Sequence, residues 1–304
     1  MPGHLIHIGF PKAGSTALAA WFDAHPQMTH APNGLGGFYS AFALAAYAAG
    51  SGPEPLWHVT SGESLSFPRL SDAAPARDPS RPARDRSLTD SRERVCRMLR
   101  ALTGEATILI VTRGFRTAML SGYSQYLKGG GRDRATELRP DPAVIAEALD
   151  YDAVVALYEE AFGRERVIVL PFELLREDPA AFVGALEARL GLRPGTAPPL
   201  EVRNPSLTPA GRVWQRRMTL AAGLVARVLP ARLGERLLAG LARLGTEDRL
   251  LRPLELLGQI APGAAEERVE VPDDVLAALR GRAASLHGRR FYDRFAAEYL
   301  NDER

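Results

Sequence analysis

A lysine lies inside a glycine-bounded turn near the start of the chain, in the segment Gly9-Phe10-Pro11-Lys12-Ala13-Gly14-Ser15-Thr16. A short apolar run, residues 5–10, leads into this turn, and residues 17–22 continue it as a predicted helix. A strand–loop–helix unit directs backbone N–H groups and a positive helix N-terminus at one point, which favours a phosphate. We therefore expect an anion-binding loop made of Lys12, Ala13, Gly14, Ser15, Thr16 and Ala17.

The spacing of this loop is close to the nucleotide-binding pattern G-x-x-x-x-G-K-[ST], with one displacement. Gly9 and Gly14 match the two glycines, but Ser15 stands where that pattern has its lysine, and Lys12 lies inside the loop. The ammonium should then meet the phosphate held by the loop amides, which suits one 5′-phosphate carrying a leaving group. The chain has 38 Lys and Arg but only two lysines, so a compact ammonium at this position indicates a chemical requirement.

Two further candidates follow predicted strands. Arg113 ends the apolar run 106–112, and Ser121 lies eight residues later in a predicted helix, so one ligand could meet both. Glu63 lies in a loop of small residues after the predicted strand 56–60. Ligands of parallel sheets bind at the carboxyl ends of strands, so we expect Lys12, Glu63 and Arg113 to converge there.

Composition limits the function classes. The chain has 304 residues, 46% of them hydrophobic, and a net charge of +2, which gives no general attraction for nucleic acid. Its single cysteine, Cys96, excludes an intramolecular disulfide, and no acidic cluster suggests a metal. No secretory signal and no apolar run of ~18 residues is visible, so the sequence predicts no membrane span and a cytoplasmic location.

Strand and helix patterns alternate along the first two thirds of the chain. This predicts an α/β fold, a three-layer P-loop-like domain whose central parallel sheet is flanked by helices. We expect the core over residues 1–208, with a mobile loop at 66–87, and a helical extension packed on the core over 209–304. Within these, residues 38–49 are predicted to form a buried helix and residues 280–300 a closing helix.

Taken together, the two anion motifs resemble those of the sulfotransferases that use 3′-phosphoadenosine 5′-phosphosulfate (PAPS). In that family P-K-x-G-[ST]-T holds the 5′-phosphosulfate, and residues 11–16 match it. An arginine, a serine eight residues later and a tyrosine two after that hold the 3′-phosphate. The corresponding residues here are Arg113, Ser121 and Tyr123.

The resemblance extends over residues 5 to about 210. The late segment 201–207 is similar to R-N-x-S-L of bacterial members and implies Arg203 as a further 3′-phosphate ligand. Phe172-Glu173-Leu174-Leu175 stands where the family usually has Tyr-Glu-Asp-Leu, so an adenine contact there would be apolar.

This resemblance implies sulfuryl transfer from PAPS to a hydroxyl or amine without a metal. Lys12 would stabilise the leaving phosphate and Glu63 would be the base, with His58 as the second candidate and His25 and His30 as possible lining of an acceptor pocket. A P-loop-type small-molecule kinase and a non-catalytic nucleotide-binding module are the alternatives. The acceptor stays open among small molecules, glycans, peptides and lipid-like compounds, as do a peripheral membrane contact and a homodimer.

Overall fold

The computed structural model describes residues 2–50, 54–68, 87–129, 131, 135, 137–200, 209–228, 233 and 269–300. The chain divides into two compact units. The first contains residues 1–115, 143–202 and 278–304, and the second contains residues 116–142 and 203–277. The predicted boundary at residue 208 stays a prediction.

The first unit is built on a five-stranded sheet in the order β2-β3-β1-β4-β5, and every pair is parallel. The strands are β1 (Gly3–His7), β2 (Met28–His30), β3 (Trp57–Ser61), β4 (Thr107–Thr112) and β5 (Val167–Pro171). The two strands beside β1 therefore come from far along the chain. Their carboxyl ends bring the segments after His7, Ser61 and Thr112 to one edge.

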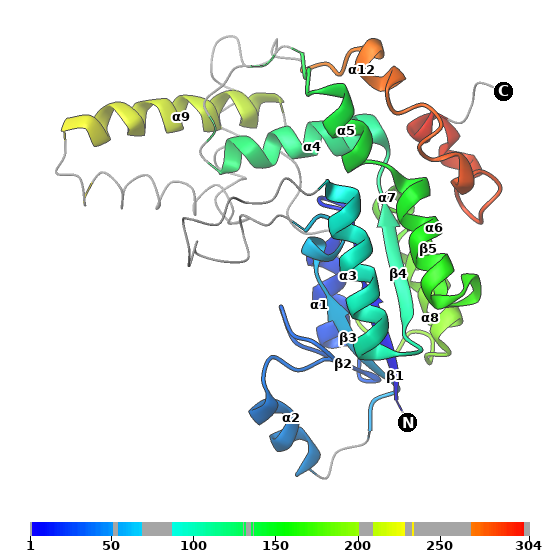
Figure 1. Cartoon of the computed structure of the whole chain (residues 1–304). Coiled ribbons are helices and arrows are strands. Elements are labelled where there is room, and N and C mark those ends of the chain that lie inside the picture. Colours follow the sequence, from blue (N-terminus) through cyan, green and yellow to red (C-terminus); the bar gives the residue numbers. More distant parts are fainter. Residues whose placement is uncertain are drawn as a thin grey trace, which may run out of the picture. The chain divides into compact units, whose positions relative to one another are not determined.

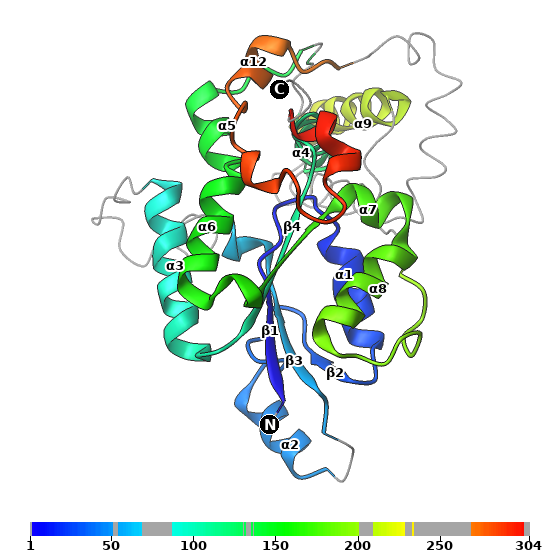
Figure 2. The same ribbon diagram turned by 90° about the vertical axis from the view of Figure 1, so that its right-hand side faces the viewer.

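Helices cover both faces of this sheet (Figures 1 and 2). Figure 2 shows α3 and α6 on one side and α1 and α8 on the other, as a three-layer domain requires. The helices of this unit are α1 (Ser15–Ala24), α2 (Ala41–Ala48), α3 (Leu88–Thr103), α6 (Tyr151–Phe162), α7 (Phe172–Glu177) and α8 (Pro179–Leu190). Helix α5 (Pro142–Ala148) begins at the boundary between the units. The predicted α/β fold is confirmed.

β4 and the edge strand β5 contribute much of the core because helices cover both faces of the sheet. β4 is wholly buried from Ile108 to Thr112 and β5 along its whole length. Continuous apolar strands of this kind are typical of parallel sheets between two helical layers. Several helices begin where the sequence offers a cap, as at Asp178, whose carboxylate accepts the amide of Ala181 at 2.9 Å.

The predicted helix at 38–49 exists, but its predicted burial is wrong. It forms α2, in which no residue is buried, and Phe42 is 80% exposed. Both views place α2 beside the amino ends of β1 and β3, whereas the lysine loop follows the carboxyl end of β1 (Figures 1 and 2). Apolar composition alone does not tell a core helix from an exposed one.

The predicted closing helix over 280–300 is also wrong. The segment consists of turns and two 3₁₀ helices, at Ala284–Leu286 and Asp293–Tyr299. Gly281 and Gly288 have φ of 76° and 73°, which an α-helix does not tolerate. The non-glycine Phe291 is likewise left-handed, at 76°. These three residues of positive φ divide the segment into short turns.

The second unit contains α4 (Phe115–Lys128) beyond its first residue, α9 (Pro209–Val228) and α12 (Asp273–Ala277). Arg116 Nη1 bonds to Val271 O at 2.8 Å, and Leu138 N to Glu270 O at 2.8 Å. The described residues leave out most of the predicted loop at 66–87 and the segment 201–207 with Arg203. They also leave out residues 229–268, except residue 233.

Candidate functional site

The lysine loop has two left-handed residues separated by one. Lys12 has φ of 67° and Gly14 of 86°, and Ala13 between them is not left-handed. Alternation of this kind turns successive backbone N–H groups toward one side, a concavity that binds anions. A left-handed conformation is uncommon for lysine and carries a cost that the surroundings must offset. The loop is therefore held in a conformation that the sequence alone does not favour.

Gly14 fits because it has no side chain. A Cβ at this position would lie 2.5 Å from Leu175 Cδ2 and 3.2 Å from Phe172 Cδ2, both in α7. Its carbonyl accepts the amides of Ala17 and Leu18 at 3.0 and 3.1 Å, which begins α1. The loop thus approaches α7 closely and starts the helix at the same residue.

Arg113 contacts the loop directly. Its Nη1 donates to the carbonyl oxygen of Lys12 at 2.6 Å, and its guanidinium lies over the ring of Phe172, 4.5 Å from the centroid. The hydroxyl of Tyr151 donates to Arg113 O. Burial lowers the pKa of Arg113 and the nearby Glu173 carboxylate raises it, so the charge is partly desolvated beside an acid.

Glu63 lies against the same loop, at the start of a 3₁₀ turn spanning Glu63–Leu65. The hydroxyl of Ser15 donates to its Oε1. Burial lowers the pKa of the Lys12 ammonium, the Glu63 carboxylate raises it, and the charge of Arg113 lowers it. The structure therefore brings Lys12, Glu63 and Arg113 together at the carboxyl end of the sheet.

Ser66 and Arg92 tie the Glu63 turn to the beginning of the loop. Ser66 is fully buried, and its hydroxyl lies 2.8 Å from Gly9 O and 3.1 Å from Glu63 O. Arg92 is also buried and donates from Nε to Ser66 O at 2.7 Å. Its other two nitrogens reach the carbonyl oxygens of Glu147 and Ala148 at 2.7 and 2.8 Å. The Arg92 guanidinium therefore links the Glu63 turn to the end of α5 and stabilises the backbone next to the site.

The predicted 3′-phosphate ligands divide between the two units. Arg113 belongs to the first unit and Ser121 to the second, so their joint action on one ligand stays a prediction. Ser121 is buried, and the hydroxyl of Tyr123 accepts the amide of Ala135 at 3.1 Å. Arg203 lies outside the described residues.

The candidate histidines lie in other surroundings. His58 pairs in register with His4 at the amino half of β3, three residues before Ser61, and its ring contacts Phe38 at 5.4 Å. His30 Nδ1 lies 2.7 Å from Asp23 Oδ1, and His25 Nδ1 accepts the amide of Gln27 at 3.1 Å. Unlike these histidines, Glu63 bonds directly to the loop through the hydroxyl of Ser15.

The sequence gives no site role to three residues that the structure places at the site: Glu173, Tyr299 and Ser66. Each acts through a partner far along the chain, and the motif that contains Glu173 indicates an adenine contact and not this role. The charged residue in Phe172-Glu173-Leu174-Leu175 was the available signal, because an acid inside an apolar run must find a partner when buried. The sequence could not say that its partner is Gly114.

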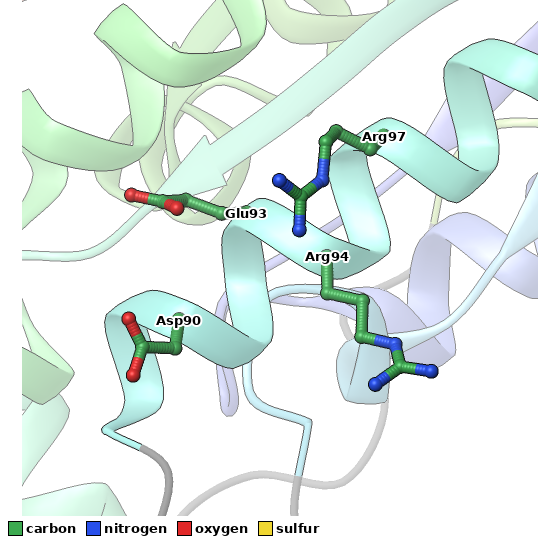
Figure 3. A pocket seen from close by; sticks show the side chains of 4 residues that line it. All are labelled: Asp90, Glu93, Arg94 and Arg97. Carbon is green, nitrogen blue, oxygen red and sulfur yellow. The ribbon is translucent and has the colours of Figure 1, made fainter.

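A pocket of about 390 Å³ lies on α3. It is lined by Asp90, Glu93, Arg94 and Arg97 (Figure 3), acids and arginines spaced as on a solvated helix face. It contains none of the predicted site residues. Among the described residues no group of three or more His, Cys, Asp or Glu could hold a metal ion, and no helix is long and apolar enough to cross a bilayer.

No protein-family model matches the chain, and no curated protein matches it. Among solved structures, the chain is similar to the crystal structure of a sulfotransferase from Alicyclobacillus acidocaldarius. The two are 16% identical, the match covers 83% of this chain and 99% of the other, and the TM-score is 0.44. This likeness is too low to assign the chain to a family.

Proposed function

We propose that this protein is a sulfotransferase that moves a sulfuryl group from PAPS to a hydroxyl or amine. The observation that supports the proposal most is the 2.6 Å hydrogen bond from Arg113 to the Lys12 carbonyl, since it joins the lysine loop to the arginine that ends the neighbouring strand. In loops that bind nucleoside triphosphates, the position of Ser15 holds the lysine, whereas here the lysine is Lys12, inside the loop. This displacement supports a ligand with a single 5′-phosphate over a nucleoside triphosphate.

In the proposed reaction an acceptor oxygen or nitrogen attacks the sulfur in line with the bond to the 5′-phosphate oxygen. That bond breaks, 3′,5′-adenosine bisphosphate (PAP) leaves, and the acceptor proton passes to the Glu63 carboxylate. Such transfers pass through a loose transition state in which charge grows on the leaving oxygen. Lys12 and the amides of the loop through Ala17 would stabilise that charge.

The proposal gives Arg113 the 3′-phosphate, with Ser121 and Arg203 as further ligands. A guanidinium has five N–H donors, so a bond to Lys12 O is compatible with a second bond to phosphate. No metal is required, because one sulfuryl group carries little charge and the loop supplies cationic and amide donors. The acceptor, a glycan, lipid-like or other small molecule, and a cytoplasmic location belong to the same proposal.

The proposal is tested with Lys12→Met, which keeps most of the side-chain volume and removes the charge. We expect calorimetric titration to show PAP binding by the wild type, and transfer of labelled sulfate from PAPS to fall about 10²–10³-fold in the variant. Arg94→Met, which removes an exposed cation on α3, is the control and should leave transfer unchanged. Transfer that persists with a chelator present separates this reaction from that of a kinase. Unchanged transfer by Lys12→Met would refute the assignment.

A further inference from the structure

Glu173 is a fully buried carboxylate at the second residue of α7. Its Oε1 accepts the backbone amide of Gly114 at 3.0 Å, and its Oε2 accepts the hydroxyl of Tyr299 at 2.8 Å. A carboxylate taken out of water is costly unless charge and hydrogen bonds compensate it. Here both oxygens have partners, so the group is built into the fold.

Glu173 also acts electrostatically on the guanidinium that contacts the loop. Glu173 opposes the lowering of the pKa of Arg113 by burial, so the two groups interact electrostatically. Gly114 directly follows Arg113, and a Cβ on it would lie 2.7 Å from Glu298 Cβ, so the turn has little room to move. Glu173 therefore fixes both the backbone after Arg113 and the charge on its side chain.

The same network extends to the end of the chain. Tyr299 Oη also lies 3.0 Å from Thr112 Oγ1, and Thr112 Oγ1 lies 2.7 Å from Tyr292 Oη. Burial raises the pKa of both tyrosines well above the usual value, so their hydroxyls stay protonated and can donate. The segment that carries them is thereby attached to the last residue of β4.

We infer that Glu173 is a positioning residue for the anion loop. By holding the Gly114 amide and the Arg113 charge, it keeps Arg113 Nη1 on the carbonyl of Lys12 and so maintains the left-handed backbone at that lysine. The consequence for nucleotide binding rests on the proposed function, but the consequence for loop conformation does not. The two can therefore be measured separately.

The test compares Glu173→Ala with Glu173→Gln, because glutamine keeps an acceptor for the Gly114 amide. The matched control is Glu187→Ala in α8, a carboxylate that is also buried and accepts the backbone amide of Gly195 at 3.2 Å. The partner of Glu187 lies in the segment after α8, not in the loop. Tyr299→Phe, which removes the second partner and keeps the ring, serves if Glu173→Ala fails to fold.

Hydrogen exchange of residues 10–18 is the readout that needs no ligand. We expect exchange there to become at least tenfold faster in Glu173→Ala, to recover part of the way in Glu173→Gln, which keeps the acceptor but not the charge, and to stay unchanged in Glu187→Ala. With Tyr299→Phe the increase should be smaller and in the same direction. Unchanged exchange over this segment in both Glu173→Ala and Tyr299→Phe would overturn the inference.

Titration with PAP provides the second readout. Glu173→Ala should bind at least tenfold more weakly than the wild type, and Glu187→Ala within twofold of it. Should the wild type itself fail to bind PAP, the proposed function is wrong, while the exchange result still decides whether Glu173 positions the loop. Loss of PAP binding equal in Glu173→Ala and Glu187→Ala would reduce Glu173 to a general stabilising role and contradict the inference.

Discussion

Arg113 donates a 2.6 Å hydrogen bond to the backbone carbonyl of Lys12, one hundred and one positions earlier in the chain. The contact joins a side chain at the end of β4 to the backbone of a left-handed residue in the loop after β1. A donor on this carbonyl helps to offset the cost of that conformation, so the arginine is part of the loop's construction as well as a candidate ligand.

Replacement of Arg113 by lysine should therefore do more than preserve a charge. Lysine lacks the planar fork and cannot stack on Phe172 as the guanidinium does at 4.5 Å. We expect Arg113→Lys and Arg113→Ala each to weaken PAP binding at least tenfold in a calorimetric titration. Arg176→Lys is the control, since that arginine is an exposed member of α7. Near-wild-type affinity in Arg113→Lys would mean that charge alone suffices.

Glu63→Gln should separate chemistry from binding. Its amide still meets the Ser15 hydroxyl, so the loop is retained, but it cannot accept the proton of the acceptor. We expect turnover to fall about 10²–10⁴-fold with PAP affinity within threefold of wild type. The control is Glu54→Gln, an exposed acid before β3. Full turnover in Glu63→Gln would return the role of base to a histidine.

Gly14→Ala probes the left-handed turn. The new methyl group would meet Leu175 Cδ2 at 2.5 Å, and φ of 86° is unfavourable for alanine, so we expect a loss of about 1–2 kcal/mol in the free energy of unfolding. Gly184→Ala in α8 is the control, because no atom lies within 4 Å of its added Cβ and a helix favours alanine. Urea denaturation measures the free energy of unfolding of both variants. Equal values would contradict the claim that a side chain at position 14 strains the loop.

Much of the fold follows from local pattern. The apolar run 106–112 predicts a strand, which is β4, and the apolar run over Val167–Pro171 is typical of a buried strand, here the edge strand β5. Asp178 before Pro179 and Gly191 are typical start and stop signals of a helix, and α8 lies between them. The three-residue β2 and the six-residue α7 were missed because such short elements have no period of their own. Their formation depends on the neighbouring strand and on the buried residues that α7 places against the loop.

The site divides in the same way. Lys12, Glu63 and Arg113 could be predicted because each follows a strand, and parallel strands end at one edge. The side chains that hold them in place could not be predicted. Glu173 and Tyr299 are 126 positions apart, and their contact depends on packing that no short motif records.

Arg92→Met should destabilise the fold. The guanidinium satisfies the carbonyl oxygens of Ser66, Glu147 and Ala148, and methionine leaves all three without that donor. We expect a loss of about 1–3 kcal/mol, the cost of one buried acceptor without a partner, because of the three only the Ser66 bond is fully buried. Thermal and urea unfolding measure it. Arg94→Met on the exposed side of α3 should change stability by less than about 0.5 kcal/mol, and a similar loss there would refute the explanation.

His7 should make the fold sensitive to mild acid. It is fully buried in β1, its Nδ1 lies 2.8 Å from Ser61 Oγ, and burial lowers its pKa from 6.5 to about 3. Below pH 6.5 the unfolded chain takes up a proton at this residue and the folded chain does not. The free energy of unfolding should therefore fall by about 1.4 kcal/mol per pH unit from this group alone, and the loss should continue toward pH 3.

The measurement is urea denaturation between pH 7 and pH 5, above the range in which ordinary carboxylates titrate. Burial also lowers the pKa of His4, His25 and His58. The free energy of unfolding of the wild type should therefore fall more steeply with decreasing pH than His7 alone would make it. His7→Asn keeps a polar group toward Ser61. In this variant the free energy of unfolding should change less with pH, by the contribution of one proton, about 1.4 kcal/mol per pH unit. Equal slopes in the wild type and His7→Asn would show that His7 is protonated in the folded state, and the buried neutral imidazole would have to be abandoned.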